Sequence, residues 1–112
     1  MAKNTNYFFK LDLLILSVLR RRDMYGYEIT KYITEITREK IVPKHGTMSP
    51  IIYQLLEEGY MTSHTELVNN KARVYYHLED KGKEYLDKIT KDYDELVECI
   101  NLIVHGGDNN EK

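Results

Sequence analysis

Hydrophobic and polar positions divide the chain into segments with different periods, and these periods predict most of its secondary structure. Residues 8–22 are apolar on almost every side, which predicts a helix that is buried on more than one face. Across residues 25–38 the apolar positions recur at spacings of three and four, as in an amphipathic helix. Residues 60–67 and 72–78 are rich in Thr, Val and Tyr, which predicts two strands joined by a turn at residues 68–71.

The segment between the second helix and the strands predicts a loop followed by a short third helix. Residues 40–46 form the expected loop, in which Pro43 ends the preceding helix. Gly46 is expected to give the backbone the freedom for a sharp entry into the next helix. Thr47 or Ser49 is then expected to cap that helix with its side-chain hydroxyl.

The third helix is predicted to carry Pro50 in its first turn and to end at Gly59. Helical spacing turns four apolar side chains toward the core: Met48, Ile52, Leu55 and Leu56. It leaves four others facing outward: Ser49, Tyr53, Gln54 and Glu57. Helices followed by a hairpin in this order are typical of a winged helix-turn-helix. The predicted fold class is therefore mainly α with a small β-hairpin, and residues 1–78 form the DNA-binding domain.

Residues 79–105 predict the longest helix, and its apolar side chains form a coiled-coil seam. The seam consists of Leu86, Ile89, Tyr93, Leu96, Ile100 and Ile103. Burying each such side chain is worth about 1.5–3 kcal/mol, so we expect a second copy of the chain to cover the seam. The alternative is that the helix packs back on its own domain. Residues 1–6 and 106–112 are polar and are predicted to be loose tails.

Charge and cysteine content narrow the class of protein. Residues 1–78 carry 11 Lys or Arg and 8 Asp or Glu, whereas residues 79–112 carry 5 and 10, so the net charge of −2 divides into +3 and −5. The basic part permits binding to nucleic acid without requiring it. A single Cys99 fits a reducing cytosol, and no segment has the pattern of a signal peptide or of a membrane span of ~20 residues. A cytoplasmic location is expected.

Catalytic chemistry is not expected from the reactive side chains. The four histidines (His45, His64, His77 and His105) are scattered, and none has a partner at zinc-ligand spacing. Cys99 has no basic neighbour that would activate its thiol. We therefore expect no enzyme activity, no metal and no cofactor.

Four groups of residues, in this order, make the chain resemble the PadR-type transcriptional regulators. They are Tyr25-Gly26-Tyr27-Glu28-Ile29, Gly46-Thr47-Met48-Ser49-Pro50, Leu55 with Glu57-Glu58-Gly59, and Arg73-Val74-Tyr75-Tyr76-His77-Leu78 with Gly82. The resemblance covers about residues 10–104 and is to the short subfamily with a single C-terminal dimerisation helix, whose members are cytoplasmic winged-helix dimers that bind inverted-repeat operators. It implies that the last helix packs against the partner's first helix. Leu11 and Leu14 then join the seam in the expected dimer contact.

The expected DNA contacts lie on the third helix and the hairpin: Lys44, Thr47, Ser49, Tyr53, Gln54, Lys71 and Arg73. The amide of Gln54 suits adenine, and Tyr53 suits a phosphate or a thymine methyl group. Hydroxyls at a helix N-terminus suit phosphate, and the three cations would anchor the DNA backbone. For each residue the alternative is an ordinary solvated side chain.

Two departures from the resembled family leave a second function open. Family members usually carry Tyr at the position of Ser49 and basic residues at the positions of Tyr53 and Gln54. The chain is therefore either a DNA-binding repressor or a winged-helix adaptor that binds proteins and has lost DNA binding.

The resemblance also implies a small planar aromatic effector, bound between subunits beside an aromatic residue midway along the last helix. Tyr93 matches that position, and the other candidates for the pocket are Phe8, Phe9, Leu13 and Ile100. The alternative is that Tyr93 is a packed residue of the seam.

Overall fold

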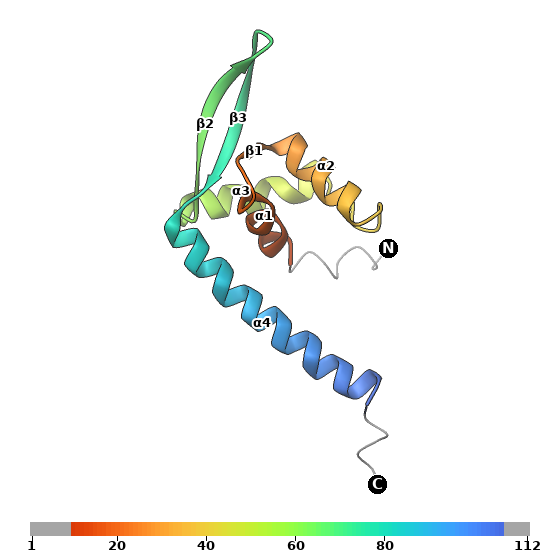
Figure 1. The fold of residues 1–112 in the computed structure, drawn as a ribbon. Helices are drawn as coiled ribbons and strands as arrows, with labels where there is room; N and C mark the ends of the chain where they lie inside the picture. The colour runs from red at the N-terminus through yellow and green to blue at the C-terminus, as the bar shows by residue number, and fades with distance from the viewer. Residues whose placement is uncertain (1–9, 107–112) are drawn as a thin grey trace.

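The computed structural model describes residues 10–106, which form four helices and a three-stranded sheet. The elements are α1 (Leu11–Leu19), β1 (Met24–Tyr25), α2 (Gly26–Ile36), α3 (His45–Glu57), β2 (Met61–Val68), β3 (Lys71–Leu78) and α4 (Asp80–Val104). Figure 1 shows the hairpin of β2 and β3 projecting from one side of a body formed by α1, α2 and α3, while α4 leaves on the other side. The predicted tail at 1–6, residues 107–112 of the predicted tail at 106–112, and the pocket residues Phe8 and Phe9 lie outside the described residues.

The core of the body is built on α1. Its central residues Ile15 and Leu16 are fully buried, as the all-round apolar pattern predicts. The same core includes Ile29 of α2 and Leu55 of α3. Helix α1 ends at Leu19, three residues before the predicted end, because the chain then extends to form a strand.

That strand, β1, is an element that the sequence pattern did not predict. It pairs antiparallel with β3, with Met24 opposite Tyr76 and Tyr25 opposite Tyr75, so the sheet order is β1-β3-β2. Two residues are too few to show an alternating pattern. Because Tyr25 belongs to β1, α2 begins one residue later than predicted, at Gly26. The Tyr25 backbone N–H donates to Glu28 Oε1 at 3.2 Å, in the first turn of α2. Helix α2 ends at Ile36 rather than at residue 38.

The hairpin of β2 and β3, which we call the wing, turns where predicted, but Val68 and Lys71 of the predicted turn belong to the strands. Asn69 and Asn70 adopt φ values of 53° and 66°, as asparagine tolerates at such positions. Pairing runs from Val68 opposite Lys71 at the tip to Met61 opposite Leu78 at the base, where both residues enter the core.

Strand alternation gives the wing two faces. The groove face carries Ser63, Thr65, Leu67, Ala72, Val74 and Tyr76, in line with buried Met61 and Leu78. The charged face carries Thr62, His64, Glu66, Arg73, Tyr75 and His77.

Helix α3 begins earlier than predicted, which corrects four expectations about its N-terminus. It starts at His45, with Lys44 in the cap position and no side-chain capping bond, so neither Thr47 nor Ser49 caps it. Gly46 lies inside the first turn instead of forming a bend, and its backbone is not left-handed. Pro50 lies in the second turn, where it removes a helical hydrogen bond to the Gly46 carbonyl.

The C-terminus of α3 matches the prediction. Gly59 has φ +80°, and two backbone bonds close the helix, from Gly59 N–H to Leu56 O (3.0 Å) and from Tyr60 N–H to Leu55 O (3.1 Å). This pattern is a Schellman motif, which a glycine in the left-handed region makes possible.

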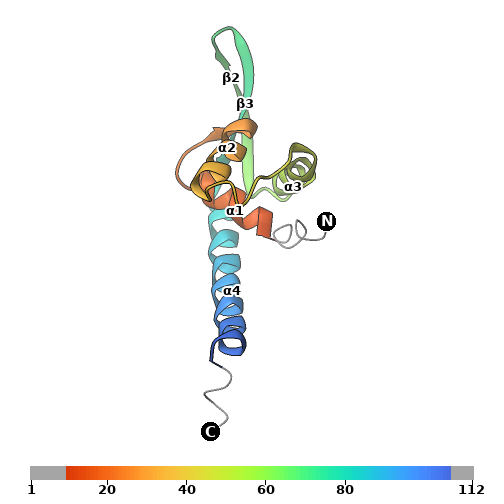
Figure 2. The same cartoon turned by 90° about the vertical axis from the view of Figure 1, so that its right-hand side faces the viewer.

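Helix α4 is attached to the body through its first half. Leu86 is buried in the core, Ile89 packs against it, and Arg20 forms an ion pair of 2.8 Å with Asp87. The second half extends beyond the body (Figure 2) and gives the molecule a length of 66 Å. Leu11 and Leu86, expected in a dimer contact, are each 1% exposed in the core of the single chain, so neither has surface left for a partner.

Candidate nucleic-acid interface

Helix α3 presents its polar residues away from the core, as predicted. Tyr53 is 65% exposed and Gln54 is also exposed, on the side of the helix opposite Met48 and Leu55. Lys44 is exposed at the N-cap, whereas Ser49 is half-buried. The helix therefore offers a hydroxyl, an amide and an aromatic side chain along one surface.

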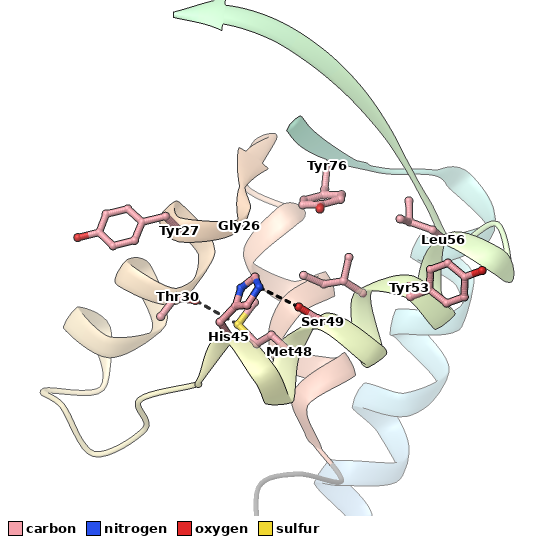
Figure 3. Close-up of a pocket in the computed structure, with 10 residues that line it drawn as sticks. Gly26, Tyr27, Thr30, His45, Met48, Ser49, Tyr53, Leu56 and Tyr76 are labelled. Atoms are coloured by element: carbon pink, nitrogen blue, oxygen red, sulfur yellow. Dashed lines mark hydrogen bonds between the residues drawn. The ribbon is translucent and has the colours of Figure 1, made fainter. Parts of the chain in front are cut away.

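A groove of about 570 Å³ separates the N-terminal part of α2 from α3, and β3 closes it at one end. Its polar side chains come from Tyr27, Thr30, His45, Ser49 and Tyr53, as Figure 3 shows. Tyr76 adds a further hydroxyl, and the remaining lining residues are Gly26, Met48, Ile52 and Leu56. The groove therefore combines an apolar floor with a rim of hydrogen-bonding groups.

Two short contacts hold the groove residues in place. His45 Nε2 lies 3.3 Å from Ser49 Oγ, one turn further along α3. The Thr30 hydroxyl donates to the sulfur of Met48 at 3.1 Å, which joins α2 to α3. The hydroxyl of Ser49 is therefore shared with a histidine instead of being directed only to solvent.

Sequence reasoning missed Tyr27, Thr30, His45 and Tyr76 as groove residues. Tyr27 gave a usable signal, because a large aromatic side chain falls outside the apolar stripe of α2, and it is strongly exposed. Tyr76 gave none, because it enters the groove only through the pairing of β3 with β1.

On the wing, Arg73 is held against an aromatic platform. Its guanidinium carbon lies 4.5 Å from the centroid of the Tyr25 ring, close enough for a cation–π interaction. Tyr25 in turn meets Tyr75 edge to face at 5.4 Å, and His64 stacks on Tyr75 at 5.7 Å. Arg73 is therefore fixed to the start of α2, whereas Lys71 is exposed near the tip.

The charges of this surface lie at its ends. Residues 45–57 include no Lys or Arg, so cations come from Lys44 before α3 and from the wing. Glu66 faces Arg73 across the hairpin, and His64 Nε2 lies 2.9 Å from Glu66 Oε2. The middle of the surface therefore has no Lys or Arg, and electrostatic attraction to phosphate would act on both sides of it.

A second groove, of about 450 Å³, lies between α1 and the middle of α4. Its lining includes Leu13 and Tyr93, so the structure brings together two of the residues predicted for an effector pocket. Ile100, also predicted, lies further along α4 and does not line the groove.

The polar centre of this groove is a hydrogen bond between α4 and α1. The Tyr85 hydroxyl donates to Asp12 Oδ2 at 2.9 Å, and its ring stacks on Tyr60 with centroids 4.2 Å apart. Burial, and then the bond to the Asp12 carboxylate, raise the pKa of Tyr85 to about 12.

Two other kinds of site are absent from residues 10–106. No group of three or more His, Cys, Asp or Glu side chains there is arranged to hold a metal ion. No helix in that part of the chain has the length and apolar character needed to span a membrane.

The element order, the two-residue β1 and the hairpin after α3 define a winged helix-turn-helix, a DNA-binding fold. Residues 15–88 match the family model described as "Transcriptional regulator PadR-like family", and the chain belongs to this family. The family is one of transcriptional regulators rather than enzymes.

Relatives and solved structures agree with this assignment. The chain is 34% identical over 77 residues to the negative transcriptional regulator PadR of Bacillus subtilis, covering 68% of this chain and 42% of that protein. It is 29% identical to an uncharacterized protein of Lysinibacillus sphaericus, covering 86% of this chain and 89% of the relative. The chain thus spans less than half of the Bacillus regulator but most of the Lysinibacillus protein.

Among solved structures, a transcriptional regulator from Clostridium thermocellum has a TM-score of 0.79 at 31% identity, covering 90% of this chain and 96% of the other. Bacillus subtilis PadR, solved in complex with operator DNA, has a TM-score of 0.65 at 32% identity, covering 71% of this chain and 46% of that one.

Proposed function

We propose that this chain is a homodimeric repressor that binds an inverted-repeat operator. The observation that carries the proposal is the exposed surface of α3 beside a projecting wing, in a member of the PadR-like family. One relative, Bacillus subtilis PadR, is named as a negative transcriptional regulator and is solved in complex with operator DNA, which supports both DNA binding and repression.

In the proposed complex, α3 enters the major groove. Gln54 makes a bidentate contact with adenine, and Tyr53 contacts a phosphate or a thymine methyl group. Thr47 and Ser49 bind phosphate oxygens near the start of the helix. Lys44, Lys71 and Arg73 contact the DNA backbone on either side, where the structure places the cations of this surface.

The proposed dimer forms through the second half of α4. Tyr93, Leu96, Ile100 and Ile103 continue the seam beyond the body, and Ile103 is 79% exposed. Ile89 and Leu14 lie at the edge of the core, beside the point where this surface begins. A second copy would bury these side chains, which a single chain leaves in water.

Sedimentation velocity tests the dimer. Ile100→Glu is expected to yield monomers, because a carboxylate in an apolar helix contact would be desolvated without a partner. Leu102→Glu is the matched control, since Leu102 is exposed but points to the opposite side of α4 by helical spacing. A wild-type protein that sediments as a monomer would contradict the proposal.

We further propose that a planar aromatic compound binds beside Tyr93 in the groove between α1 and α4. The volume of about 450 Å³ and the position of Leu13 and Tyr93 on its walls support this. A panel of such compounds should change both tyrosine fluorescence and DNA affinity. If neither changes, no effector of this class binds.

The decisive experiment is a titration of the protein with DNA from its own upstream region and with a scrambled duplex, at several salt concentrations. Lys44, Lys71 and Arg73 of two subunits would make roughly six phosphate contacts, so the log–log salt slope is expected to be about −5. If no preference appears, a selection from random-sequence DNA follows.

An adaptor that binds a protein partner is the second candidate. It is favoured by one feature, the absence of Lys and Arg from residues 45–57. Failure of both the titration and the selection would make it the better proposal.

A further inference from the structure

The tip of the wing carries an exposed apolar patch that is not part of the hydrophobic core. Leu67 is 77% exposed and Val74 is 44% exposed, and both lie on the groove face of the hairpin. Ala72 is paired opposite Leu67 and adds only a methyl group. Large apolar side chains on an exposed hairpin favour aggregation through strand pairing. Exposed apolar patches also mark interaction sites, so we expect a binding partner to cover this one.

Distance prevents the body of the protein from covering this patch. Leu67 lies six residues beyond Met61, the last residue of β2 that enters the core. At ~3.3 Å per residue this places it roughly 20 Å further along the strand. Figure 1 shows the same relationship, since the wing rises clear of α1, α2 and α3.

The patch is continuous with the proposed DNA surface. Along β3, Ala72, Val74 and Tyr76 follow one another on the groove face, and Tyr76 lines the groove beside α3. The cation Lys71 stands at the turn, paired with Val68 on the charged face of the hairpin, and can hold a phosphate on the rim of the same DNA groove. The wing tip therefore carries an apolar surface on one face and a cation on the other, which suits a base stack bordered by phosphates.

We propose that Leu67, supported by Val74, acts as a wedge that enters the minor groove beside the site bound by α3 and opens a base step; this rests on the proposed DNA binding. A minor groove about 6 Å wide does not admit a two-stranded ribbon, so the tip enters only where the groove is widened. Apolar wedges of this kind partly unstack a step and bend the duplex. Pyrimidine–purine steps deform most easily, so the wing favours sequences in which such a step lies at the tip. This preference comes from the energy needed to deform the DNA and not from contacts with base edges.

The test uses duplexes that the wild-type protein selects from a random-sequence pool, end-labelled with a donor and an acceptor fluorophore. Affinity comes from anisotropy, and the bend comes from energy transfer in the saturated complex. The wild type is expected to bend the duplex by roughly 20–90° and to enrich TA or CA steps outside the contacts of α3. Leu67→Thr introduces a β-branched residue, which suits a strand, and should bind about tenfold more weakly, with a smaller bend.

Two further variants separate the wedge from other effects. Leu102→Thr changes an equally apolar, exposed residue of α4 and should leave affinity and bend unchanged. Leu67→Lys adds a cation at the tip: a wedge predicts weaker binding and a smaller bend, whereas a wing that only touches phosphates predicts tighter binding. Circular dichroism checks that each variant is folded.

The outcomes distinguish the two proposals. If Leu67→Thr binds and bends DNA as the wild type does, or if Leu67→Lys binds more tightly, the wedge is overturned and the proposed function stands. If the wild type enriches no duplex from the pool, the proposed function fails, and the wedge fails with it.

Discussion

The guanidinium of Arg73 lies over the ring of Tyr25, 4.5 Å from its centroid, and this contact joins the middle of the wing to the residue that precedes α2. An arginine restrained in this way has already lost much of its side-chain freedom before it meets a ligand. It can therefore contact a phosphate with a smaller entropic cost than an unrestrained side chain.

We expect Arg73→Ala to weaken binding to every duplex by a similar factor, because a phosphate contact carries no sequence information. The salt slope should fall by about one for each subunit. Arg73→Lys keeps the charge but loses the planar group that stacks on Tyr25, so its affinity should lie between those of the wild type and Arg73→Ala. Anisotropy titrations at several salt concentrations measure all three. A Lys variant indistinguishable from the wild type would show that stacking does not matter.

Gln54→Ala should act differently, by relaxing the preference for one base pair. A bidentate contact to adenine is worth about 1–3 kcal/mol of discrimination, and its loss should leave affinity for scrambled DNA unchanged. Competition assays with single-base variants of the selected site measure this. Glu57→Gln, one turn further along α3, is the control, since it removes a negative charge and should raise affinity for all duplexes alike. Equal binding of selected and scrambled DNA by the wild type would contradict the role given to Gln54.

Gly46→Ala is expected to raise the stability of the protein and to lower its affinity for DNA. A Cβ at Gly46 would meet no atom within 4 Å, and the residue lies within α3, so alanine should stabilise the protein by about 0.5–1 kcal/mol. The same methyl group would stand on the exposed surface near the N-terminus of α3, where the proposed DNA backbone passes, so affinity should fall. Urea unfolding and DNA titration measure the two effects. Greater stability with unchanged affinity would mean that DNA does not approach Gly46.

Gly82→Ala should destabilise the fold, because α4 passes very close to the chain at Tyr60. A Cβ there would press on the Tyr60 carbonyl oxygen and lie 2.8 Å from Cδ1 of Leu78, and a backbone atom cannot move aside as a side chain can. We expect a loss of about 1–3 kcal/mol, measured by thermal unfolding at fixed protein concentration. Gly26→Ala is the control, since its Cβ would meet nothing within 4 Å. Equal stability of the two variants would contradict the close contact.

The Tyr85–Asp12 hydrogen bond predicts a loss of stability at high pH. The pKa of Tyr85 is raised from 10.0 to about 12 in the folded protein, so above pH 10 the unfolded chain releases a proton that the folded chain keeps. The stabilising contribution is complete below pH 10 and is lost as the pH rises toward 12. Urea unfolding of the wild type and of Tyr85→Phe at pH 8 and pH 11 tests this, because the variant should lose less stability between the two values. Parallel losses would show that Tyr85 is not responsible.

The local chemistry of the chain was sufficient to predict the order of its four helices and of the hairpin, but not β1. The all-round apolar pattern of α1, Gly59 at the end of α3 and the paired asparagines of the wing each follow from short-range preferences. These depend on a few neighbouring residues, so they can be inferred without knowing what lies across the fold. The same reasoning placed Tyr53 and Gln54 on the outer side of α3, as the structure has them.

Tertiary contacts decided the features that local preference does not contain. Strand β1 forms because Met24 and Tyr25 pair with the backbone of β3, and α1 ends earlier than predicted so that the chain can reach this strand. The groove beside α3 forms from Tyr27, His45 and Tyr76, which are far apart in sequence. Helical spacing placed Leu86 and Ile103 on one seam, but only the packing of α4 on the body buried the first and left the second exposed. Periodicity determines which side of an element is apolar, whereas the position of the rest of the chain determines what covers it.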